Sequence, residues 1–214
     1  MHEPLKAAVI HNGIEGLDGL YPDSAFMVYN RISVAYPVQL DISQYDVLIV
    51  PNGSDHVFME CIKDTVEAFL AAGGVLCCFD GWFTPWVPGN RWVMDNSRRT
   101  IDVRYKVVSD PYGFMKGIDI DGLNFSNGIS GWWACGYIQP AAEAIVVLED
   151  TWHRPLLIVD EHSTNGTMIL SASAPLSDST YATTDDDASM QAVAGIYRNI
   201  VEFMHAKKYA YEKS

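Results

Sequence analysis

Two cysteines and an aspartate stand at the end of an apolar run in GGVLCCFDGW, residues 73–82. A thiol exposed on a tight turn can act as a nucleophile, and a carboxylate at the same place can act as a general acid or base. Cys78 and Asp80 are therefore candidates for catalysis. The alternative for Cys78 is packing inside the apolar run, where burial makes a thiol inert. The alternative for Asp80 is a turn residue that caps the backbone amides after it.

A polar turn also follows the apolar residues 7–10, and it contains His11 and Asn12. Ligands of open α/β sheets bind beyond the carboxyl ends of the strands. Both side chains are therefore candidate ligand contacts, and His11 is a further candidate acid or base. A lone histidine is more often held by structural hydrogen bonds than used in chemistry, so both interpretations of His11 stay open.

Another polar turn follows the apolar residues 47–50. The candidate ligand contacts at this turn and at the end of residues 75–79 are Asn52, Gly53, Asp55, Asp80, Gly81 and Trp82. Ser54 or Asp55 is also a natural N-cap, because a short polar side chain can accept a hydrogen bond from the first amides of a helix. We expect this structural role to account for Asp55.

Most of the tryptophans fall in a stretch rich in glycine and proline, at about residues 82–140. They are Trp82, Trp86, Trp92, Trp132 and Trp133. Aromatic faces over a cleft suit sugar rings or other flat ligands, and they are also common at protein interfaces. We place Trp82 at the candidate ligand site, with Trp132 or Trp133 as a cover. The alternative is that the rings supply a core to a region poor in regular structure.

The remaining motifs favour neither a metal nor a cofactor. His153, Glu161 and His162 lack the spacing that would bring two ligands to one face, and no GxGxxG motif is present for a phosphate. No metal site and no cofactor are predicted. None of the four cysteines forms a CxxC motif, so we expect them to be reduced and buried, in a cytoplasmic protein.

Charge and hydropathy exclude two classes of partner. The formal net charge is -13, and the 14 lysines and arginines are scattered, whereas nucleic-acid binding needs a basic stripe. No apolar stretch reaches the roughly 18 residues that a membrane span needs. The N-terminus leads straight into a strand-like run without a visible secretory signal. We therefore predict neither nucleic acid nor membrane as a partner, and a small-molecule ligand or a second copy of the chain instead.

Strands and helices alternate in the first part of the chain. Residues 7–10 and 47–50 read as buried strands of a parallel sheet, with a helix expected within residues 14–30 and a strand within 31–40. Residues 55–72 repeat apolar positions at helical spacing, and Gly73 and Gly74 then provide a C-terminal cap. The next strand, residues 75–79, completes a right-handed crossover unit.

The later strands of the chain are predicted to make the sheet a mixed one. Residues 82–140 are expected to form loops and a hairpin, with one alternating stretch at residues 101–107. AIVVLED and PLLIVDE read as a hairpin joined at TWHR, and GTMILSAS returns to the sheet. A long amphipathic helix follows at residues 187–208. Its inner face is predicted to carry Met190, Val193, Ile196, Ile200, Phe203 and Met204.

The strand that ends in YDVLIVPNGSDH, the helix after it and FLAAGGVLCCFDGW together resemble the class I glutamine amidotransferase-like superfamily. DPYGFMKGID and AIVVLEDTWHRPLLIVDEHSTNGTMILSAS are more specifically similar to the trehalose-utilisation (ThuA-like) and β-galactosidase middle-domain branches. The resemblance extends from Tyr45 to about Ser173. It implies an α/β fold, a flavodoxin-like three-layer sandwich with a mostly parallel sheet. We expect one domain, residues 1–214, that carries the Trp-rich insertion.

The resemblance also implies where a catalytic cysteine would stand. Members that act as amidotransferases carry a Gly-x-Cys-x-Gly turn and a later His-x-Glu pair. Placing Gly81 on the second glycine puts Phe79 at the nucleophile position, and a shift by one residue brings Cys78 there instead. Glu161 and His162 stand in the wrong order for the pair. The catalytic cysteine is therefore interpreted as lost.

The sequence thus predicts a non-catalytic or divergent amidotransferase-like protein that binds a small polar ligand or a partner chain. By resemblance alone, carbohydrate metabolism is the expected setting. One alternative is a hydrolase or isomerase that uses Asp80, His11 or Cys78. Another is a structural module that mediates oligomerisation, as the resemblance to the β-galactosidase trimer implies.

Overall fold

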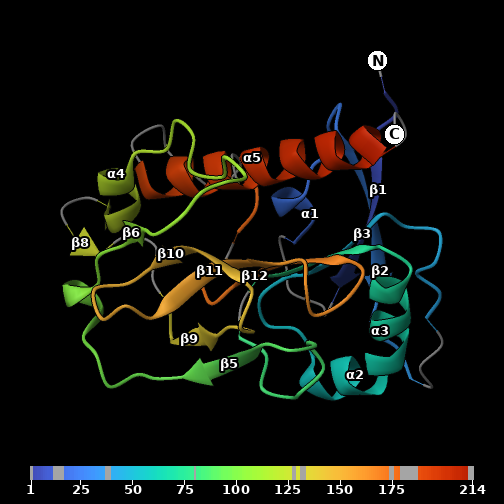
Figure 1. Cartoon of the computed structure of the whole chain (residues 1–214), viewed down its shortest axis with the longest axis horizontal. Helices are drawn as coiled ribbons and strands as arrows, with labels where there is room; N and C mark the ends of the chain where they lie inside the picture. The colour runs from blue at the N-terminus through green and yellow to red at the C-terminus, as the bar shows by residue number, and fades with distance from the viewer. Residues whose placement is uncertain are drawn as a thin grey trace.

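The computed structural model describes residues 2–11, 17–36, 40–79, 81–126, 129–130, 134–173, 176–178 and 188–211. Within these residues, eight strands form one sheet in the order β2-β1-β3-β4-β12-β11-β10-β6 (Figure 1). Their bounds are β1 Leu5–His11, β2 Met27–Ser33, β3 Val47–Val50, β4 Val75–Phe79, β6 Lys106–Val107, β10 Ile145–Glu149, β11 Pro155–Asp160 and β12 Thr167–Ser171. The strands from β2 to β12 are parallel, and β11, β10 and β6 continue the sheet with antiparallel pairing.

Helices cover both faces of this sheet. Their bounds are α1 Leu17–Leu20, α2 His56–Cys61, α3 Lys63–Ala71, α4 Ile120–Asn124 and α5 Ala188–Tyr211, with a 3₁₀ turn at Thr100–Asp102. The long helix α5 crosses one face, and α2 and α3 lie on the other side (Figure 1). The predicted flavodoxin-like three-layer α/β fold with a mostly parallel sheet is therefore confirmed. None of the described helices is both long and apolar enough to cross a bilayer.

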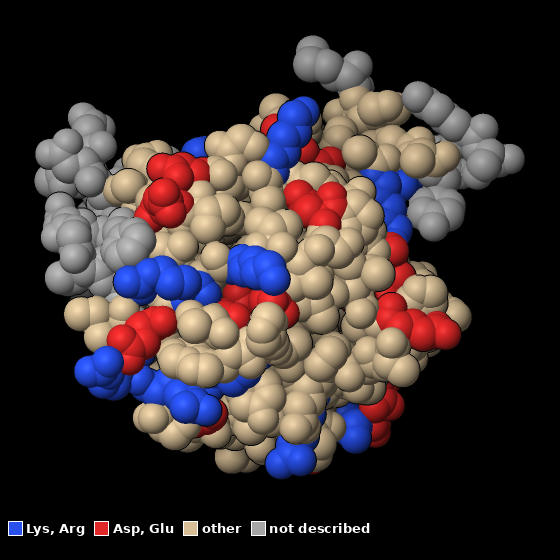
Figure 2. All heavy atoms as spheres, turned by 60° about the vertical axis from the view of Figure 1, so that its left-hand side comes forward, with Lys and Arg blue, Asp and Glu red and all other residues tan. Residues whose placement is uncertain are grey.

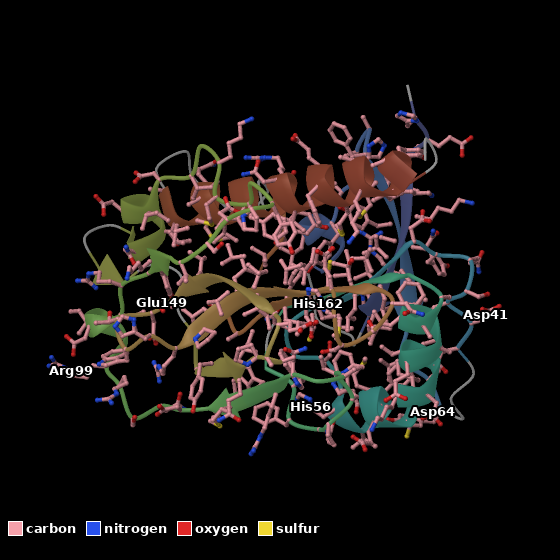
Figure 3. The ribbon with its side chains drawn as sticks, in the orientation of Figure 1. Asp41, His56, Asp64, Arg99, Glu149 and His162 are labelled. Carbon is pink, nitrogen blue, oxygen red and sulfur yellow. The ribbon has the colours of Figure 1, made fainter. Side chains whose placement is uncertain are left out.

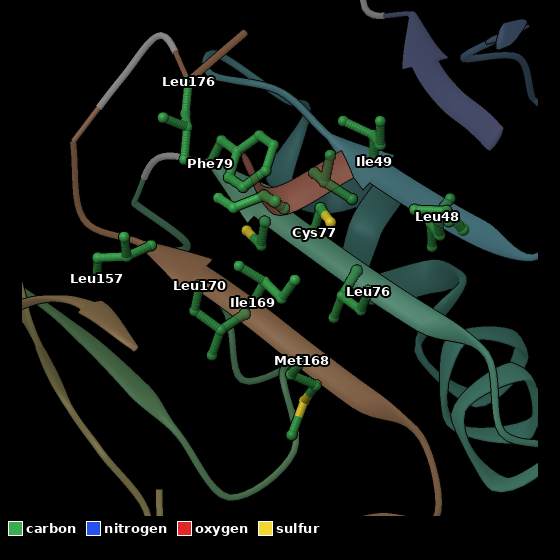
Figure 4. Close-up of a cluster of buried hydrophobic side chains, with 14 of the residues drawn as sticks. Leu48, Ile49, Leu76, Cys77, Phe79, Leu157, Met168, Ile169, Leu170 and Leu176 are labelled. Atoms are coloured by element: carbon green, nitrogen blue, oxygen red, sulfur yellow. The ribbon is translucent and has the colours of Figure 1, made fainter. Parts of the chain in front are cut away.

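The centre of the sheet forms the main core. All four residues of β3 are buried, and so are the last four of β4, because helices cover both faces of these parallel strands. Side chains of β3, β4 and β12 interlock there, with Phe79 and Leu176 near the ends of the strands (Figure 4). The apolar runs that predicted strands at residues 47–50 and 75–79 match β3 and β4.

The predicted helix at residues 55–72 is divided into α2 and α3. The chain turns at Ile62, whose φ of -98° and ψ of 8° end α2 and begin α3. The predicted inner face is nevertheless buried, at Phe58, Ile62, Val66, Phe69 and Leu70. Gly73 then adopts a φ of +92°, and the amides of Gly73 and Gly74 donate to the carbonyls of Leu70 and Phe69, both at 3.0 Å. This is the expected glycine C-cap.

The second strand begins earlier than predicted. The sequence favoured residues 31–40, whereas β2 spans Met27–Ser33 and pairs with all of β1, starting at Leu5 and Met27. As an edge strand, β2 buries Met27 and Tyr29 on alternate positions instead of carrying a continuous apolar run. The helix expected within residues 14–30 is the single turn α1.

The Trp-rich segment holds more regular structure than loops and a local hairpin. The strand β5 (Arg91–Met94) pairs with the distant β9 (Gly136–Gln139), and the short β7 (Phe125–Ser126) pairs with β8 (Ile129–Ser130). The alternating stretch at residues 101–107 buries Val103 and Tyr105 but contributes just the two-residue β6 to the main sheet. By contrast, the predicted hairpin of β10 and β11 and the return through β12 are confirmed.

The burial expected of all four cysteines is wrong for two of them. Cys77 and Cys78 are buried in β4, whereas Cys61 and Cys135 are exposed, and all four thiols are free. Cys61 stands at the end of α2, outside the apolar face that its spacing defines. Cys135 directly precedes β9.

The Asp160 side chain, at the end of β11, connects the main sheet to the Trp-rich segment through hydrogen bonds. One carboxylate oxygen accepts the amides of His162 (2.9 Å) and Ser163 (3.0 Å), and the other accepts the Ser163 hydroxyl (2.6 Å) and the Asn90 amide (2.7 Å). Asn90 in turn accepts the amide of Ala141 (2.9 Å). Burial alone would raise the pKa of Asp160, but the hydrogen bonds from Ser163, Asn90 and His162 hold that pKa below its usual range.

We predict that Asp160→Asn lowers the free energy of unfolding by about 2–3 kcal/mol at neutral pH, because a charged acceptor of four hydrogen bonds is replaced by an amide that must also donate. Asp41→Asn is the matched control. Asp41 accepts the amide (2.9 Å) and hydroxyl (2.6 Å) of Ser43 on an exposed turn, so its loss is expected to cost about 0.5 kcal/mol or less. Urea unfolding measures the change in the free energy of unfolding for both variants.

The loss of stability caused by Asp160→Asn is expected to depend on pH. Since the pKa of Asp160 is lower in the folded chain than in the unfolded one, its contribution is fully present above the unfolded pKa of about 3.9. That contribution is lost as the pH falls through the folded pKa. The stability difference between wild type and Asp160→Asn is therefore expected to shrink below about pH 4. Equal differences at neutral and strongly acid pH would contradict this account.

Candidate functional site

The parallel strands bring three of the candidate turns to one edge of the sheet. β1 pairs with β3 at Val9 and Ile49, and β3 pairs with β4 at Val50 and Cys78, so their carboxyl ends lie side by side. His11 is the last residue of β1 and is half-buried. Asn52 and Gly53 follow β3, and Gly81 and Trp82 follow β4. Asn12, Asp80, Trp132 and Trp133 lie outside the described residues.

The turn after β3 uses its polar side chains to build the backbone. Gly53 adopts a φ of +71°, the left-handed conformation that glycine tolerates best. The buried Ser54 hydroxyl donates to the carbonyl of Pro51 (2.6 Å), and Asp55 accepts the amide of Phe58 (2.9 Å) as the N-cap of α2. The structure therefore gives Asp55 the capping role that the sequence favoured.

The end of β4 holds its sulfur atoms inside the core. Cys77 is fully buried, and its thiol donates to the sulfur of Met204 in α5 (3.7 Å). Burial raises the pKa of Cys77, which keeps it a neutral thiol near neutral pH. Cys78 points to the opposite face of the strand and is 3% exposed. A nucleophile needs an accessible thiolate, and neither thiol offers one in this conformation.

Phe79, which the resemblance aligns with the nucleophile, is also buried. It is the last residue of β4 and is 0% exposed. Its ring meets the ring of Tyr197 in α5 edge-on, with centroids 6.1 Å apart. The hydroxyl of Tyr197 shares a hydrogen bond with Tyr29 of β2 (2.8 Å). The position that the resemblance aligns with the nucleophile thus belongs to the packing between the sheet and α5.

An aromatic series continues from β4 toward the start of α2. Gly81 lies under the Trp92 ring so closely that a Cβ atom there would come within 2.5 Å of it. Trp92 contacts Phe83 edge-on (4.8 Å between centroids), and Phe83 contacts His56 in the same way (4.6 Å). Phe83 is 60% exposed, so this series reaches the surface at the carboxyl edge.

The described tryptophans of the Trp-rich segment are buried. Trp82, Trp86 and Trp92 are between 1% and 6% exposed, which favours their role as a core for this segment over an open binding face. Among the described residues, the indole N–H groups of Trp86 and Trp92 are buried without a hydrogen-bond partner. Buried donors of this kind are rare.

The histidines considered as metal ligands are separate. The ring of His153, in the hairpin turn with a φ of 60°, lies 2.7 Å from the carboxylate of Glu149. His162 follows β11, and its ring nitrogen Nδ1 lies 3.2 Å from the carboxylate of Glu143. Figure 3 shows His162 well away from Glu149. The described part of the chain holds no group of three side chains able to ligate a metal ion.

Charges of both signs are interleaved on the face shown in Figure 2. Ion pairs among the described residues include Arg99 with Asp102 (2.7 Å), Lys106 with Glu149 (3.5 Å) and Arg154 with Asp95 (2.8 Å).

A cavity formed by described residues lies at the opposite edge of the sheet, and sequence reasoning missed it. Its volume is about 630 Å³, and it is lined by the first residues of β3, β4 and β12 and by Lys207 and Lys208 of α5. The sheet rule directs attention to carboxyl ends, whereas this cavity lies at amino ends. The adjacent lysines at the end of the predicted helix were the one signal for it.

Solved structures that are similar to this chain include a glutamine amidotransferase and two cytoplasmic proteins. A glutamine amidotransferase from Thermotoga maritima matches with a TM-score of 0.61 and 11% identity, over 95% of this chain and 99% of its own. Two cytoplasmic proteins from Salmonella typhimurium match with TM-scores of 0.60 and 0.59, at 13% and 11% identity. These matches cover 93% and 94% of this chain, and 98% and 99% of theirs.

At these identities the likeness shows the fold alone. No family model matches the sequence, and the search of curated proteins finds no match. The expected amidotransferase-like architecture is confirmed at the level of the fold. The trehalose-utilisation branch and the loss of the cysteine stay interpretations.

We predict that Gly81→Ala lowers the free energy of unfolding by about 1–3 kcal/mol, because the new methyl group overlaps the Trp92 ring. In a Trp92→Leu background, which removes the ring, the same substitution is expected to cost less, with a coupling of about 1 kcal/mol. Denaturant unfolding of the four variants measures this cycle. Equal costs in both backgrounds would contradict the contact.

Proposed function

We propose that this chain is an amidotransferase-like protein without amidotransferase chemistry, and that it binds a small polar ligand at the carboxyl edge of its sheet. The observation that carries the proposal is the state of β4, where both thiols and Phe79 are buried at the point where a nucleophile would have to be exposed. A glutamine amidotransferase with the same fold needs a reactive thiolate there.

The carboxyl edge supplies the polar groups for binding. His11 ends β1, Asn52 follows the neighbouring β3, and both are half-buried, so a ligand between them would lose much of its contact with water. Ligands of α/β sheets bind in this position because loops at the carboxyl ends surround it. Gly53 lets a ligand approach the backbone closely, since it carries no side chain. Gly81 does not offer the same approach, because the Trp92 ring fills the space beside its backbone.

A carbohydrate-related compound is the ligand class to examine first. The resemblance to the trehalose-utilisation and β-galactosidase branches is the reason for this choice. Polar side chains such as Asn52 and His11 can satisfy hydroxyl groups, and the exposed Phe83 offers a ring face to the apolar side of a sugar. A partner chain, including a second copy of this protein, is the alternative occupant of this edge.

Thiol labelling tests the loss of the nucleophile. With iodoacetamide at neutral pH, we expect Cys61 and Cys135 to react quickly because they are exposed, and Cys77 and Cys78 to react at a rate limited by unfolding. Peptide mapping by mass spectrometry assigns each site, so the two exposed cysteines serve as internal controls. Fast labelling of Cys78 that depends on pH would overturn the proposal.

A thermal-shift screen tests binding at the carboxyl edge. With trehalose, galactose and their phosphates as probes, a ligand at a hundred times its Kd should add about 2.7 kcal/mol to the free energy of unfolding. His11→Ala and Asn52→Ala are expected to remove the effect, and Glu60→Gln, on the exposed face of α2, to retain it. Stabilisation that both alanine variants retain, turnover of a probe, or dimerisation through this edge would each contradict the ligand-binding proposal.

A further inference from the structure

The cavity at the amino edge has the size and the lining of a small-molecule site. Its volume of about 630 Å³ falls within the range of known ligand pockets, roughly 300–1,000 Å³. A second cavity of about 380 Å³ adjoins it and shares Tyr45, Ala72 and Gly74 with it. Both are made of described residues far along the strands from His11 and Asn52, so they are separate from the carboxyl edge.

One polar side of the cavity is built around Lys207. Its ammonium group pairs with the carboxylate of Glu161 and donates to the hydroxyl of Thr167 (2.6 Å). The hydroxyl of Tyr112 donates to the other oxygen of Glu161 (2.9 Å). Burial alone would raise the pKa of Glu161, but the bonds from Lys207 and Tyr112 lower it, so this carboxylate is charged at neutral pH.

The other polar side is a second ion pair. Lys208 donates to one oxygen of Asp46 (2.9 Å), and the amide of Lys6 donates to the other (2.9 Å). Successive residues of a helix point about 100° apart, and Lys207 and Lys208 therefore reach toward β12 and β3 respectively. The side chains of both pairs are between 23% and 36% exposed, so water reaches them from the cavity.

The floor between the two pairs is apolar. Leu5, Val47 and Met204 are buried there, and Val75 is half-buried. The backbone of Gly73 and Gly74 forms one wall, and Gly166 packs so tightly on it that a Cβ would come within 2.3 Å of the Gly74 carbonyl. The cavity thus combines two ammonium groups and two carboxylates with an aliphatic surface.

We propose that this cavity binds a small zwitterion of the amino-acid class. A ligand with one charge would compete for one member of an ion pair and leave the other without its partner, which is costly in a partly buried position. A ligand that carries an ammonium and a carboxylate replaces both charges of a pair at once. Its aliphatic side chain then covers the floor of Leu5, Val47 and Met204, and removes that surface from water.

Three matched probes test the charge requirement. L-norleucine carries both charges, hexanoate lacks the ammonium group, and pentylamine lacks the carboxylate, while all three share an aliphatic chain. We expect isothermal titration calorimetry to detect L-norleucine and to show about tenfold weaker binding, or none, for each of the other two. No binding of L-norleucine, or equal binding of hexanoate or pentylamine, would overturn the proposal.

Two substitutions assign the binding to this cavity. Ala72 is an exposed residue at the end of α3 that lines both cavities, so Ala72→Phe should fill them without disturbing an ion pair and should abolish L-norleucine binding. Ala71→Phe, one residue earlier and outside the lining, is the control and should bind normally. Binding that Ala72→Phe retains would refute the site, whatever the outcome at the carboxyl edge.

A variant of Lys207 separates ligand binding from a purely structural role. Lys207→Met keeps the aliphatic stem and removes the ammonium group, and we expect it to weaken L-norleucine binding about tenfold or more. Lys63→Met removes an exposed lysine from its pair with Glu67 on α3 and should leave binding unchanged. If Lys207→Met lowers the Tm but binds L-norleucine as wild type does, the pair is structural and the proposal fails.

Discussion

The packing of α5 on the sheet is the constraint on which the rest of the molecule depends. Tyr197 and Met204 of this helix contact Phe79 and Cys77 of β4, the central strand whose end carries the family's nucleophile in the resemblance. Because these contacts bury the end of β4, a side chain there packs against α5 and is not accessible to a substrate. The same helix then extends to the amino edge, where its last lysines line the large cavity.

The sequence was sufficient for the parallel core because the signals there are local and strong. Uninterrupted apolar runs predict β3 and β4. The spacing of Phe58, Ile62 and Val66 predicts the helical segment that connects these strands along the chain. It was insufficient for β2 and β5, since an edge strand and a two-stranded sheet with a distant partner are defined by pairing that sequence periodicity does not encode.

Some of the candidate functional residues could likewise be assigned from the sequence, and others could not. Asp55 could be assigned as an N-cap because its type and place define that role locally. The cavity at the amino edge could not be found, because Asp46, Glu161 and Lys207 come together from three distant parts of the chain. The tryptophans were ambiguous in sequence, and the burial of Trp82, Trp86 and Trp92 favours packing.

The central claim is that this fold persists here without the thiolate that hydrolyses glutamine. Release of ammonia from glutamine, measured with the wild-type chain and with Cys78→Ser, tests it most directly. We expect no release above the uncatalysed rate in either protein, since Cys77 and Cys78 are buried. Release by the wild type that disappears in Cys78→Ser but persists in Cys61→Ser would contradict the account.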